Sequence, residues 1–184
     1  MARKSNQYLT VMLLDFEKAY DRVDWSFLEG TMAKMGFAEN WIKGISSLYK
    51  SATSKVLLAG GKGSSFQLTR SVRQGCPMAP FLFLMYAEAM STFLRSEIVG
   101  IQGLSLPNTD ECLVDSEFAD DTALYVKGTR ENLHRVEHAL TIFCLGLGAK
   151  INWNKIVAFW VGESGFPNWK PHPQFLWILE GKTT

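Results

Sequence analysis

Three aspartates are the residues of this chain whose type and position best fit metal-dependent chemistry. Asp120 and Asp121 are adjacent and interrupt a run of apolar residues, and Asp15 ends a shorter apolar run. Adjacent carboxylates repel each other, so one of them is driven toward protonation unless a cation neutralises the pair. An ordinary alternative stays open for each, because aspartate also forms polar turns and caps helices.

Taken together, the three carboxylates indicate phosphoryl transfer. If they stand at the ends of neighbouring strands, they can hold two divalent cations about 4 Å apart, which activate an attacking oxygen and stabilise a leaving one. Mg2+ suits so small a set, because it binds few carboxylates and takes substrate phosphates as further ligands. The residue types therefore suggest a two-Mg2+ site formed by Asp15, Asp120 and Asp121.

Hydrophobic periodicity predicts the elements that must position these residues. Strands are expected at residues 9–14, 53–59, 65–71, 113–118, 122–126 and 156–161. Helices are expected from residue 25 to Gly36, near 41–49, from the prolines at 77 and 80 to Arg95, and from 133 to the glycines at 146 and 148. The third helix is apolar on nearly every side, which predicts that it is buried. The order predicts an α+β fold with one sheet and helices on one face.

Length and composition fit a single folded domain. The chain has 184 residues, of which 47% are hydrophobic and 20% charged, with a net charge of +1. That composition excludes a disordered or collagen-like protein, and the charge provides no global basic field.

The neutral total conceals two segments of opposite charge. No acidic residue lies between Glu39 and Glu88, whereas six acidic and no basic residues occur from Asp110 to Asp121. The two segments suggest a phosphate-contacting region and a cation-binding region, with two ordinary solvated faces as the alternative.

Other features exclude several classes of protein. The three cysteines are widely spaced and form no C-x-x-C pair, which argues against a disulfide scaffold or a zinc site. The apolar run at residues 78–87 is too short to span a bilayer. The first residues carry no small-residue cleavage site after their apolar run, so we expect no targeting signal, no membrane association and an intracellular location.

Four stretches of the chain, in order, resemble motifs of one known family. They are Leu14-Asp15-Phe16-Glu17-Lys18-Ala19-Tyr20-Asp21-Arg22-Val23-Asp24-Trp25, Val72-Arg73-Gln74-Gly75-Cys76-Pro77-Met78-Ala79-Pro80, Phe118-Ala119-Asp120-Asp121 and Gly148-Ala149-Lys150-Ile151-Asn152-Trp153-Asn154-Lys155. This set resembles the reverse transcriptase of LINE-type non-LTR retrotransposons. One Phe-Ala-Asp-Asp is weak evidence, but the ordered set is specific, and the resemblance covers about residues 8–162.

The resemblance implies an RNA-directed DNA polymerase, and a fold like a polymerase palm, with an antiparallel sheet and helices packed on one face. By motif, Asp15 and Asp120 correspond to the principal ligands of two Mg2+ ions, and Asp121 completes the acidic cluster. Lys155 resembles a lysine that acts as general acid toward the leaving pyrophosphate, although a loop lysine is usually only solvated.

The resemblance also implies substrate-binding residues. Tyr20 matches the aromatic position that excludes a ribose 2′-hydroxyl by occupying its volume, with a core aromatic as the alternative. Gln74 and Gly75 match a motif beside the incoming nucleotide and the template, where a glycine allows close approach of the backbone. Arg73 is placed to contact phosphate, unless it is an ordinary exposed arginine.

The domain organisation follows from the same resemblance. Residues 1–161 are expected to form a partial palm without fingers and thumb, and residues 162–184 a tail of unclear structure. Trp177 stands where the family's primer-grip turn has a glycine. We expect catalysis in a longer parent enzyme and none from this chain alone.

Two other classes of function stay open. The chain can be a non-catalytic remnant that folds or binds nucleic acid without turnover. An unrelated metal enzyme, such as one acting on prenyl diphosphates, is disfavoured because Leu124 stands where its motif needs a third aspartate.

Partners are implied only by the family: an RNA template, a DNA primer and deoxynucleoside triphosphates. A nuclear site of action has the same basis, and the oligomeric state is not predicted.

Overall fold

The computed structural model describes residues 8–118, 120–161 and 175–179. The chain divides into two compact units, one formed by Met1–Ala19 with Ala87–Thr184 and the other by Tyr20–Tyr86. The predicted carboxylate site belongs to the first unit.

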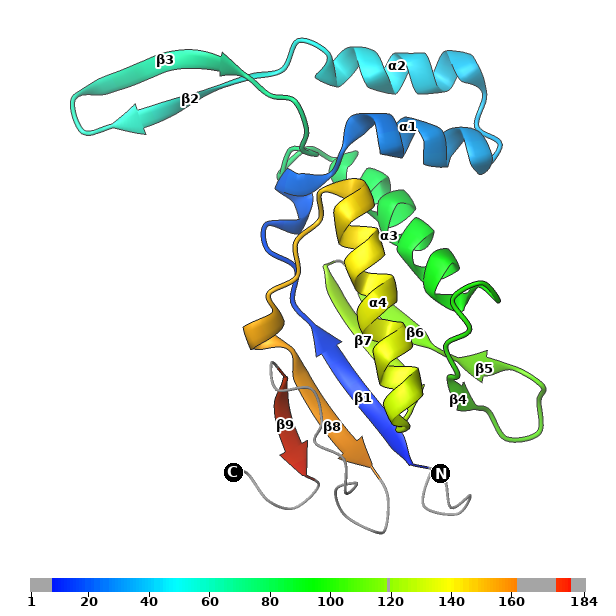
Figure 1. The fold of residues 1–184 in the computed structure, drawn as a ribbon. Helices are drawn as coiled ribbons and strands as arrows, with labels where there is room; N and C mark the ends of the chain where they lie inside the picture. Colours follow the sequence, from blue (N-terminus) through cyan, green and yellow to red (C-terminus); the bar gives the residue numbers. More distant parts are fainter. Residues whose placement is uncertain (1–7, 119, 162–174, 180–184) are drawn as a thin grey trace. The chain divides into compact units, whose positions relative to one another are not determined.

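The first unit is built on a five-stranded sheet in the order β6-β7-β1-β8-β9 (Figure 1). Its strands are β1 (Leu9–Leu14), β6 (Asp115–Phe118), β7 (Asp121–Lys127), β8 (Val157–Val161) and β9 (Leu176–Leu179). Neighbouring strands are antiparallel, except that β8 and β9 run parallel. The expected antiparallel sheet is confirmed, and β1, the first strand in sequence, is paired on both sides.

The sheet has one covered face and one open face. Met12 and Leu14 are almost fully buried, whereas Leu13 between them is 43% exposed. Side chains of a strand point alternately to the two faces, so this pattern defines the orientation of β1. Leu124 of β7 pairs with Met12 and is also fully buried, which places both on the covered face.

Two helices cover that face, as the sequence predicts. The helix α4 (Arg130–Leu147) begins at Thr129, whose side chain accepts a hydrogen bond from Asn132 N, and ends at Gly148 with φ of +66°. That left-handed conformation suits glycine because it has no Cβ. The helix α3 (Ala79–Arg95) is bonded through Ser91 and Arg95 to Asp115, on the same face of β6. Figure 1 shows α4 lying across the sheet.

The prediction that the third helix is buried is wrong in part. Leu82 and Leu94 of α3 are fully buried, but Phe81 and Leu84 are 65% and 61% exposed. Apolar periodicity does not distinguish a helix buried all round from one that keeps an exposed apolar face.

The second unit contains the helices α1 (Trp25–Lys34) and α2 (Glu39–Tyr49) and a β-hairpin. Asp24 caps α1 by accepting hydrogen bonds from Phe27 N at 3.0 Å and Ser26 Oγ at 2.5 Å. The bond from Ser26 is the main reason that the pKa of Asp24 is lowered. Leu28 and Met32 of α1 are buried, as is Ile45 of α2.

The hairpin consists of β2 (Thr53–Leu58) and β3 (Gly61–Gln67). The strands predicted at residues 53–59 and 65–71 leave the glycine-rich residues 60–64 between them as a connection. Instead Leu58 pairs directly with Gly61, and the register shifts between Lys55 and Leu57. The glycines therefore have two roles. Gly60 forms the turn with a φ of +117°, and Gly63 lies in the irregular part of β3, where a side chain would contact the backbone of Val56.

The remaining elements are short. They are the strands β4 (Leu104–Ser105) and β5 (Cys112–Leu113) and the 3-10 turns η2 (Ala19–Arg22) and η3 (Trp153–Lys155). The strand expected at 113–118 is thus divided between β5 and β6. Within the described ranges, no helix is both long and apolar enough to cross a membrane.

Candidate active site

The strand register brings three aspartates to one end of the sheet. The last residue pair between β1 and β7 is Leu14 with Thr122. Asp15 directly follows Leu14, and Asp121 directly precedes Thr122. Phe118 pairs with Asp121 at the end of the β6–β7 hairpin, so Asp120 lies in its turn. The backbones of Asp15, Asp120 and Asp121 therefore lie at adjacent strand ends.

The same alternation predicts the face on which the carboxylates lie. Asp15 is two residues from Leu13, and Asp121 is two residues from Ala123, which are both outside the buried core. Residues two apart in a strand share a face, so Asp15 and Asp121 belong to the open face. Asp120 and Asp121 are exposed, and 44% of the Asp15 side chain is exposed. A ligand reaching this end of the sheet from solvent would meet acidic oxygens.

Asp15 is held by the segment that follows α4. Its carbonyl oxygen accepts a hydrogen bond from Asn152 N at 2.9 Å, and its Oδ2 accepts one from Asn152 Nδ2. Two residues later, Glu17 N donates to Lys150 O at 2.8 Å, and the Lys150 ammonium forms an ion pair with Glu17 at 2.6 Å. This ladder orients the Asp15 carboxylate. The alternative in which Asp15 caps a helix is not observed, since Asp24 performs that role.

Lys155 approaches Asp15 from the same segment. Its Nζ lies 3.6 Å from Asp15 Oδ2, with 68% of the lysine side chain exposed. An ion pair so exposed contributes little to stability. The contact places a protonated amine beside the first aspartate of the predicted cluster.

The aspartates fit a hard divalent cation in chemical type, because their oxygens are the ligands that Mg2+ prefers. In the part of the chain that the structure describes, no three His, Cys, Asp or Glu side chains are grouped closely enough to hold a metal ion. The expectation that these residues bind two ions therefore depends on two observations: all three are aspartates, and all three lie at adjacent strand ends.

The predicted substrate-binding residues lie in the other unit. Tyr20 is in η2, half-buried, and its ring stacks on Phe83 with centroids 4.4 Å apart and planes at 13°. Its carbonyl oxygen accepts a hydrogen bond from Val72 N at 2.9 Å. Tyr20 is thus an ordered, packed aromatic that still has an exposed part.

Arg73, Gln74 and Gly75 form an exposed loop before α3. Cys76 N donates to Arg73 O at 3.1 Å, which closes a turn, and Gly75 has a φ of +83°. Among the described residues, no atom other than those of Gly75 and its two chain neighbours lies within 4 Å of the place where a Cβ of Gly75 would stand. The glycine is required by its backbone conformation and leaves open space above the loop.

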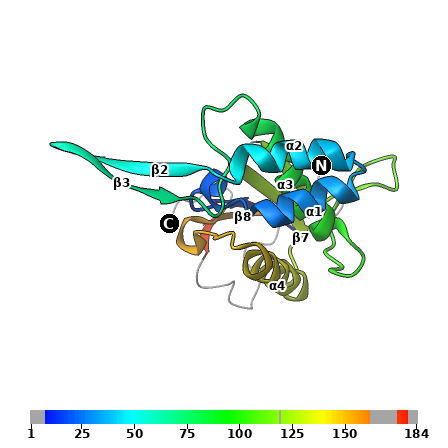
Figure 2. The same ribbon diagram turned by 90° about the horizontal axis from the view of Figure 1, so that it is seen from above.

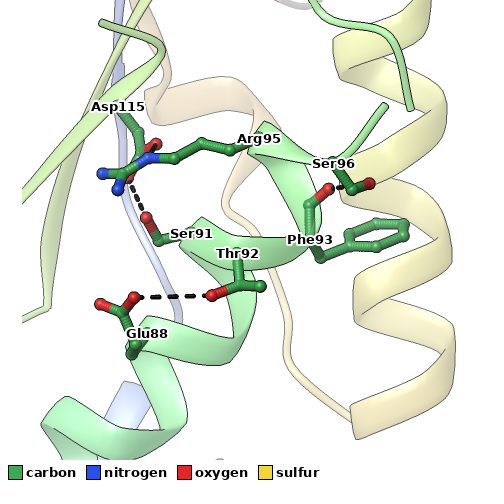
Figure 3. Close-up of polar contacts among 7 residues, drawn as sticks. All are labelled: Glu88, Ser91, Thr92, Phe93, Arg95, Ser96 and Asp115. Carbon is green, nitrogen blue, oxygen red and sulfur yellow. Dashed lines mark hydrogen bonds and ion pairs between the residues drawn. The ribbon is translucent and has the colours of Figure 1, made fainter. Parts of the chain in front are cut away.

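A polar cluster lies between α3 and β6 that the sequence pattern does not predict. Asp115 has a fully buried side chain and accepts hydrogen bonds from Ser91 Oγ at 2.6 Å and from Arg95 Nε at 2.7 Å (Figure 3). The hydrogen bond that Arg95 donates to the Asp115 carboxylate is the main reason that the pKa of Arg95 is raised. The only signal in the sequence was an acidic residue in an apolar strand.

Glu117 lies two residues further along β6 and lacks such partners. Its Oε1 is buried and has no hydrogen-bond partner among the described residues. Burial, followed by the nearby charges of Asp115 and Glu88, raises the pKa of Glu117 to about 7. A half-buried carboxyl that binds its proton more tightly than usual therefore lies in the strand that leads to Asp120.

A cavity of about 420 Å3 lies between α1 and α2 in the second unit. None of the predicted site residues lines it; its walls are formed by Trp25, Leu28, Glu29, Met32, Lys43, Ile45, Ser46, Tyr49 and Lys50. It shares no residue with the predicted catalytic or substrate-binding groups.

Comparison with known proteins identifies relatives among mobile elements. The chain is 31% identical over 154 residues to the transposon TX1 uncharacterized 149 kDa protein of Xenopus laevis, covering 84% of this chain and 12% of that protein. It is 27% identical over 157 residues to the Pol polyprotein of the retrotransposable element R2DM of Drosophila melanogaster, covering 85% and 14%. The chain thus spans about an eighth of the length of these relatives.

The fold is similar to that of a telomerase. The apo telomerase of Candida tropicalis, truncated from its C-terminal domain, superposes with a TM-score of 0.64 at 19% identity, covering 90% of this chain and 33% of that chain. The family model for reverse transcriptase (RNA-dependent DNA polymerase) matches residues 1–176. Because the relatives are proteins of non-LTR retrotransposons, the resemblance seen in the motifs is confirmed. The chain belongs to the reverse transcriptase family.

Proposed function

We propose that this chain is the palm of an RNA-directed DNA polymerase that extends a DNA primer on an RNA template from deoxynucleoside triphosphates. Reverse transcriptases generally use divalent metal ions. In the proposal, Asp15, Asp120 and Asp121 hold two Mg2+ ions. The observation that carries it is the β1–β7 register, which brings the three carboxylate-bearing residues to one end of the sheet.

The bound ions would activate the primer hydroxyl and stabilise the oxygen that leaves with pyrophosphate. The chain's own residues prepare the site for this. Asn152 holds Asp15 through two hydrogen bonds, one to its backbone carbonyl oxygen and one to its carboxylate, so one metal ligand is oriented before substrate binds. Lys155, 3.6 Å from Asp15, supplies a proton to the leaving pyrophosphate.

The second unit supplies substrate selection in this proposal. The ring of Tyr20 is held by its stack on Phe83, so it can exclude a ribose 2′-hydroxyl by occupying its volume. Gln74 lies against the nucleotide and the template, and the open space above Gly75 admits them to the backbone. Arg73 binds phosphate through its exposed guanidinium.

Catalysis belongs to the longer parent protein in this proposal, and the site of action is the nucleus. The relatives are about eight times as long as the matched region. We therefore expect this chain to bind metal ions but to catalyse no primer extension by itself.

Metal binding tests the site directly. Titration of the full chain with Mn2+, followed by the paramagnetic resonance of the free ion, uses a cation with the same preference for carboxylate oxygen. The Asp120→Asn substitution is expected to weaken binding at least about tenfold, because it removes one charged ligand. Asp110→Asn, which removes an exposed aspartate from a loop, is the matched control and is expected to change nothing.

Primer extension on an RNA template with Mg2+ is the second measurement. It compares the chain alone with the chain in its parent protein, each with and without Asp120→Asn. Extension by the parent that survives the substitution would refute the proposed site. Unchanged Mn2+ binding in Asp120→Asn would refute it independently of activity.

A further inference from the structure

The β2–β3 hairpin has two faces of different chemistry. Along β2, Lys55 and Leu57 alternate with Val56 and Leu58, so the two pairs point to opposite faces. Lys62 pairs with Leu57, which places both lysines on one face. We call this the basic face of the hairpin. The opposite face is apolar and contains Val56, Leu58 and Phe66, since Phe66 pairs with Ser54.

The basic face is exposed to solvent and not neutralised by the protein. Lys55 and Lys62 are both exposed, and neither forms an ion pair with a described carboxylate. No acidic residue occurs in the sequence between Glu39 and Glu88. The positive charge of the hairpin is therefore available to an anionic partner.

Further cations lie at the base of the hairpin. Gln67 Nε2 donates to Lys50 O at 3.2 Å, and Leu68 N donates to Ala52 O at 2.9 Å, so the strand pair continues to the end of α2. Lys50 is exposed there, and Arg70, which is also exposed and interacts electrostatically with the Asp24 carboxylate, follows β3 by three residues. Figure 2 shows the hairpin extending from the end of α2 within the second unit.

We propose that the basic face binds the phosphate backbone of a nucleic-acid duplex. Lys62 pairs with Leu57, and Lys55 lies two residues before Leu57 across the register shift, so the two ammonium groups occupy separate places on this face and can reach separate phosphates. A duplex carries about one negative charge per 1.7 Å of its axis, which makes it a dense partner for such a face. The contact does not depend on the base sequence of the duplex, because a lysine that binds a phosphate makes no hydrogen bond to a base edge.

A duplex fits this face better than a single strand does. Proteins that bind single strands generally place aromatic rings where bases can stack. The aromatic residue of the hairpin, Phe66, lies on the apolar face, opposite the lysines. This inference takes the identity of the duplex, RNA–DNA, from the proposed function, and its location from the hairpin alone.

The test measures the affinity of the full chain for a short RNA–DNA duplex by fluorescence anisotropy over a series of salt concentrations. Lys55→Gln combined with Lys62→Gln is expected to weaken binding and to reduce the slope of log K against log salt by about 2, one for each phosphate contact. The control combines Lys34→Gln with Arg130→Gln, which removes two exposed cations elsewhere and gives the same net charge. The control is expected to keep the slope of the original chain.

Three results would overturn the inference: no duplex binding by the unmodified chain, equal slopes for the two double variants, or tighter binding to single-stranded RNA of the same sequence. All substituted side chains are exposed, so an unchanged melting temperature is expected for both variants. The Asp120→Asn chain separates the two proposals. If the hairpin binds the duplex but the Asp120→Asn variant still binds Mn2+ as the unmodified chain does, only the proposal for the active site is refuted.

Discussion

The five-stranded sheet and the β2–β3 hairpin are both ladders of paired strands, but they differ in what covers them. Met12 and Leu124 at the centre of the sheet are completely buried beneath helices. On the hairpin, Leu57 and Leu58 are 74% and 66% exposed. The sheet is thus stabilised by burial of one face, whereas the hairpin depends on backbone pairing.

This difference corresponds to the two functions in our proposals, which are catalysis at the sheet and binding of a nucleic-acid backbone by the hairpin. Catalysis needs ligands held in fixed positions, and a packed sheet provides that rigidity. A backbone-binding arm needs exposed charge and tolerates local opening, because an isolated two-stranded hairpin is only marginally stable.

The largest difference is expected from matched truncations of leucine. Leu124→Ala leaves a cavity in the buried sheet and should lower the free energy of unfolding by about 2–5 kcal/mol. Leu58→Ala in the hairpin should change it by less than about 0.5 kcal/mol, because the side chain is already in solvent. Urea denaturation followed by circular dichroism measures both. Similar losses would show that the hairpin is packed.

Breaking the ion pair between the half-exposed Arg95 and the buried Asp115 is expected to have a slightly smaller effect. Arg95→Met leaves the buried Asp115 carboxylate with Ser91 as its partner and should cost about 3 kcal/mol, because an uncompensated charge remains inside. Replacing both residues, as Arg95→Met with Asp115→Leu, should recover most of that loss. Urea denaturation of both variants checks this, and a double variant as unstable as the single one would contradict it.

Glu117 should make the stability of the sheet depend on pH. Its pKa rises from 4.5 to about 7 on folding, so the folded state binds the proton more tightly. The penalty for burying its charge is therefore absent below about pH 4.5, grows as the pH rises and is complete above about pH 7. Glu117→Gln should thus stabilise the protein at alkaline pH by roughly 1–3 kcal/mol, allowing for its partial exposure.

Urea denaturation across this pH range measures the effect of Glu117. Glu111→Gln, at an exposed position in the same acidic segment, is the control and should change little at any pH. A Glu117→Gln variant that shows the same stabilisation at pH 4 and pH 8 would contradict the assignment.

The smallest effect should be confined to the hairpin. Gly60 has a φ of +117°, which an alanine adopts only with strain, so Gly60→Ala should weaken the turn by about 1 kcal/mol. Hydrogen exchange of the β2–β3 amides should then accelerate roughly fivefold, with no change in β1 or β7. Slower exchange in the hairpin would exclude strain at this turn.

Gly146→Ala is the control for this last substitution. Gly146 lies within α4 with open space around it, so alanine should stabilise that helix by up to about 1 kcal/mol and leave the hairpin unchanged.

Much of the fold could be predicted because its signals are local. The apolar run that forms β1, the glycine that ends α4 and the alternation in β7 each act within a few residues. The exposed apolar residues of α3 and the exact hairpin turn were not predictable in this way. Exposure depends on what packs against a side chain, and register depends on which strand positions pair.

For the candidate site, the sequence by itself determined the residue types and their order: aspartates after two apolar strands, and the motifs of a reverse transcriptase. Only the tertiary structure decided that Asp15 and Asp121 lie at adjacent strand ends, because they are more than a hundred residues apart in sequence. It also decided that Asn152 orients Asp15, that Asp115 is paired, and that Glu117 Oε1 has no hydrogen-bond partner among the described residues. Such contacts depend on distances between remote segments, which no local pattern of residues specifies.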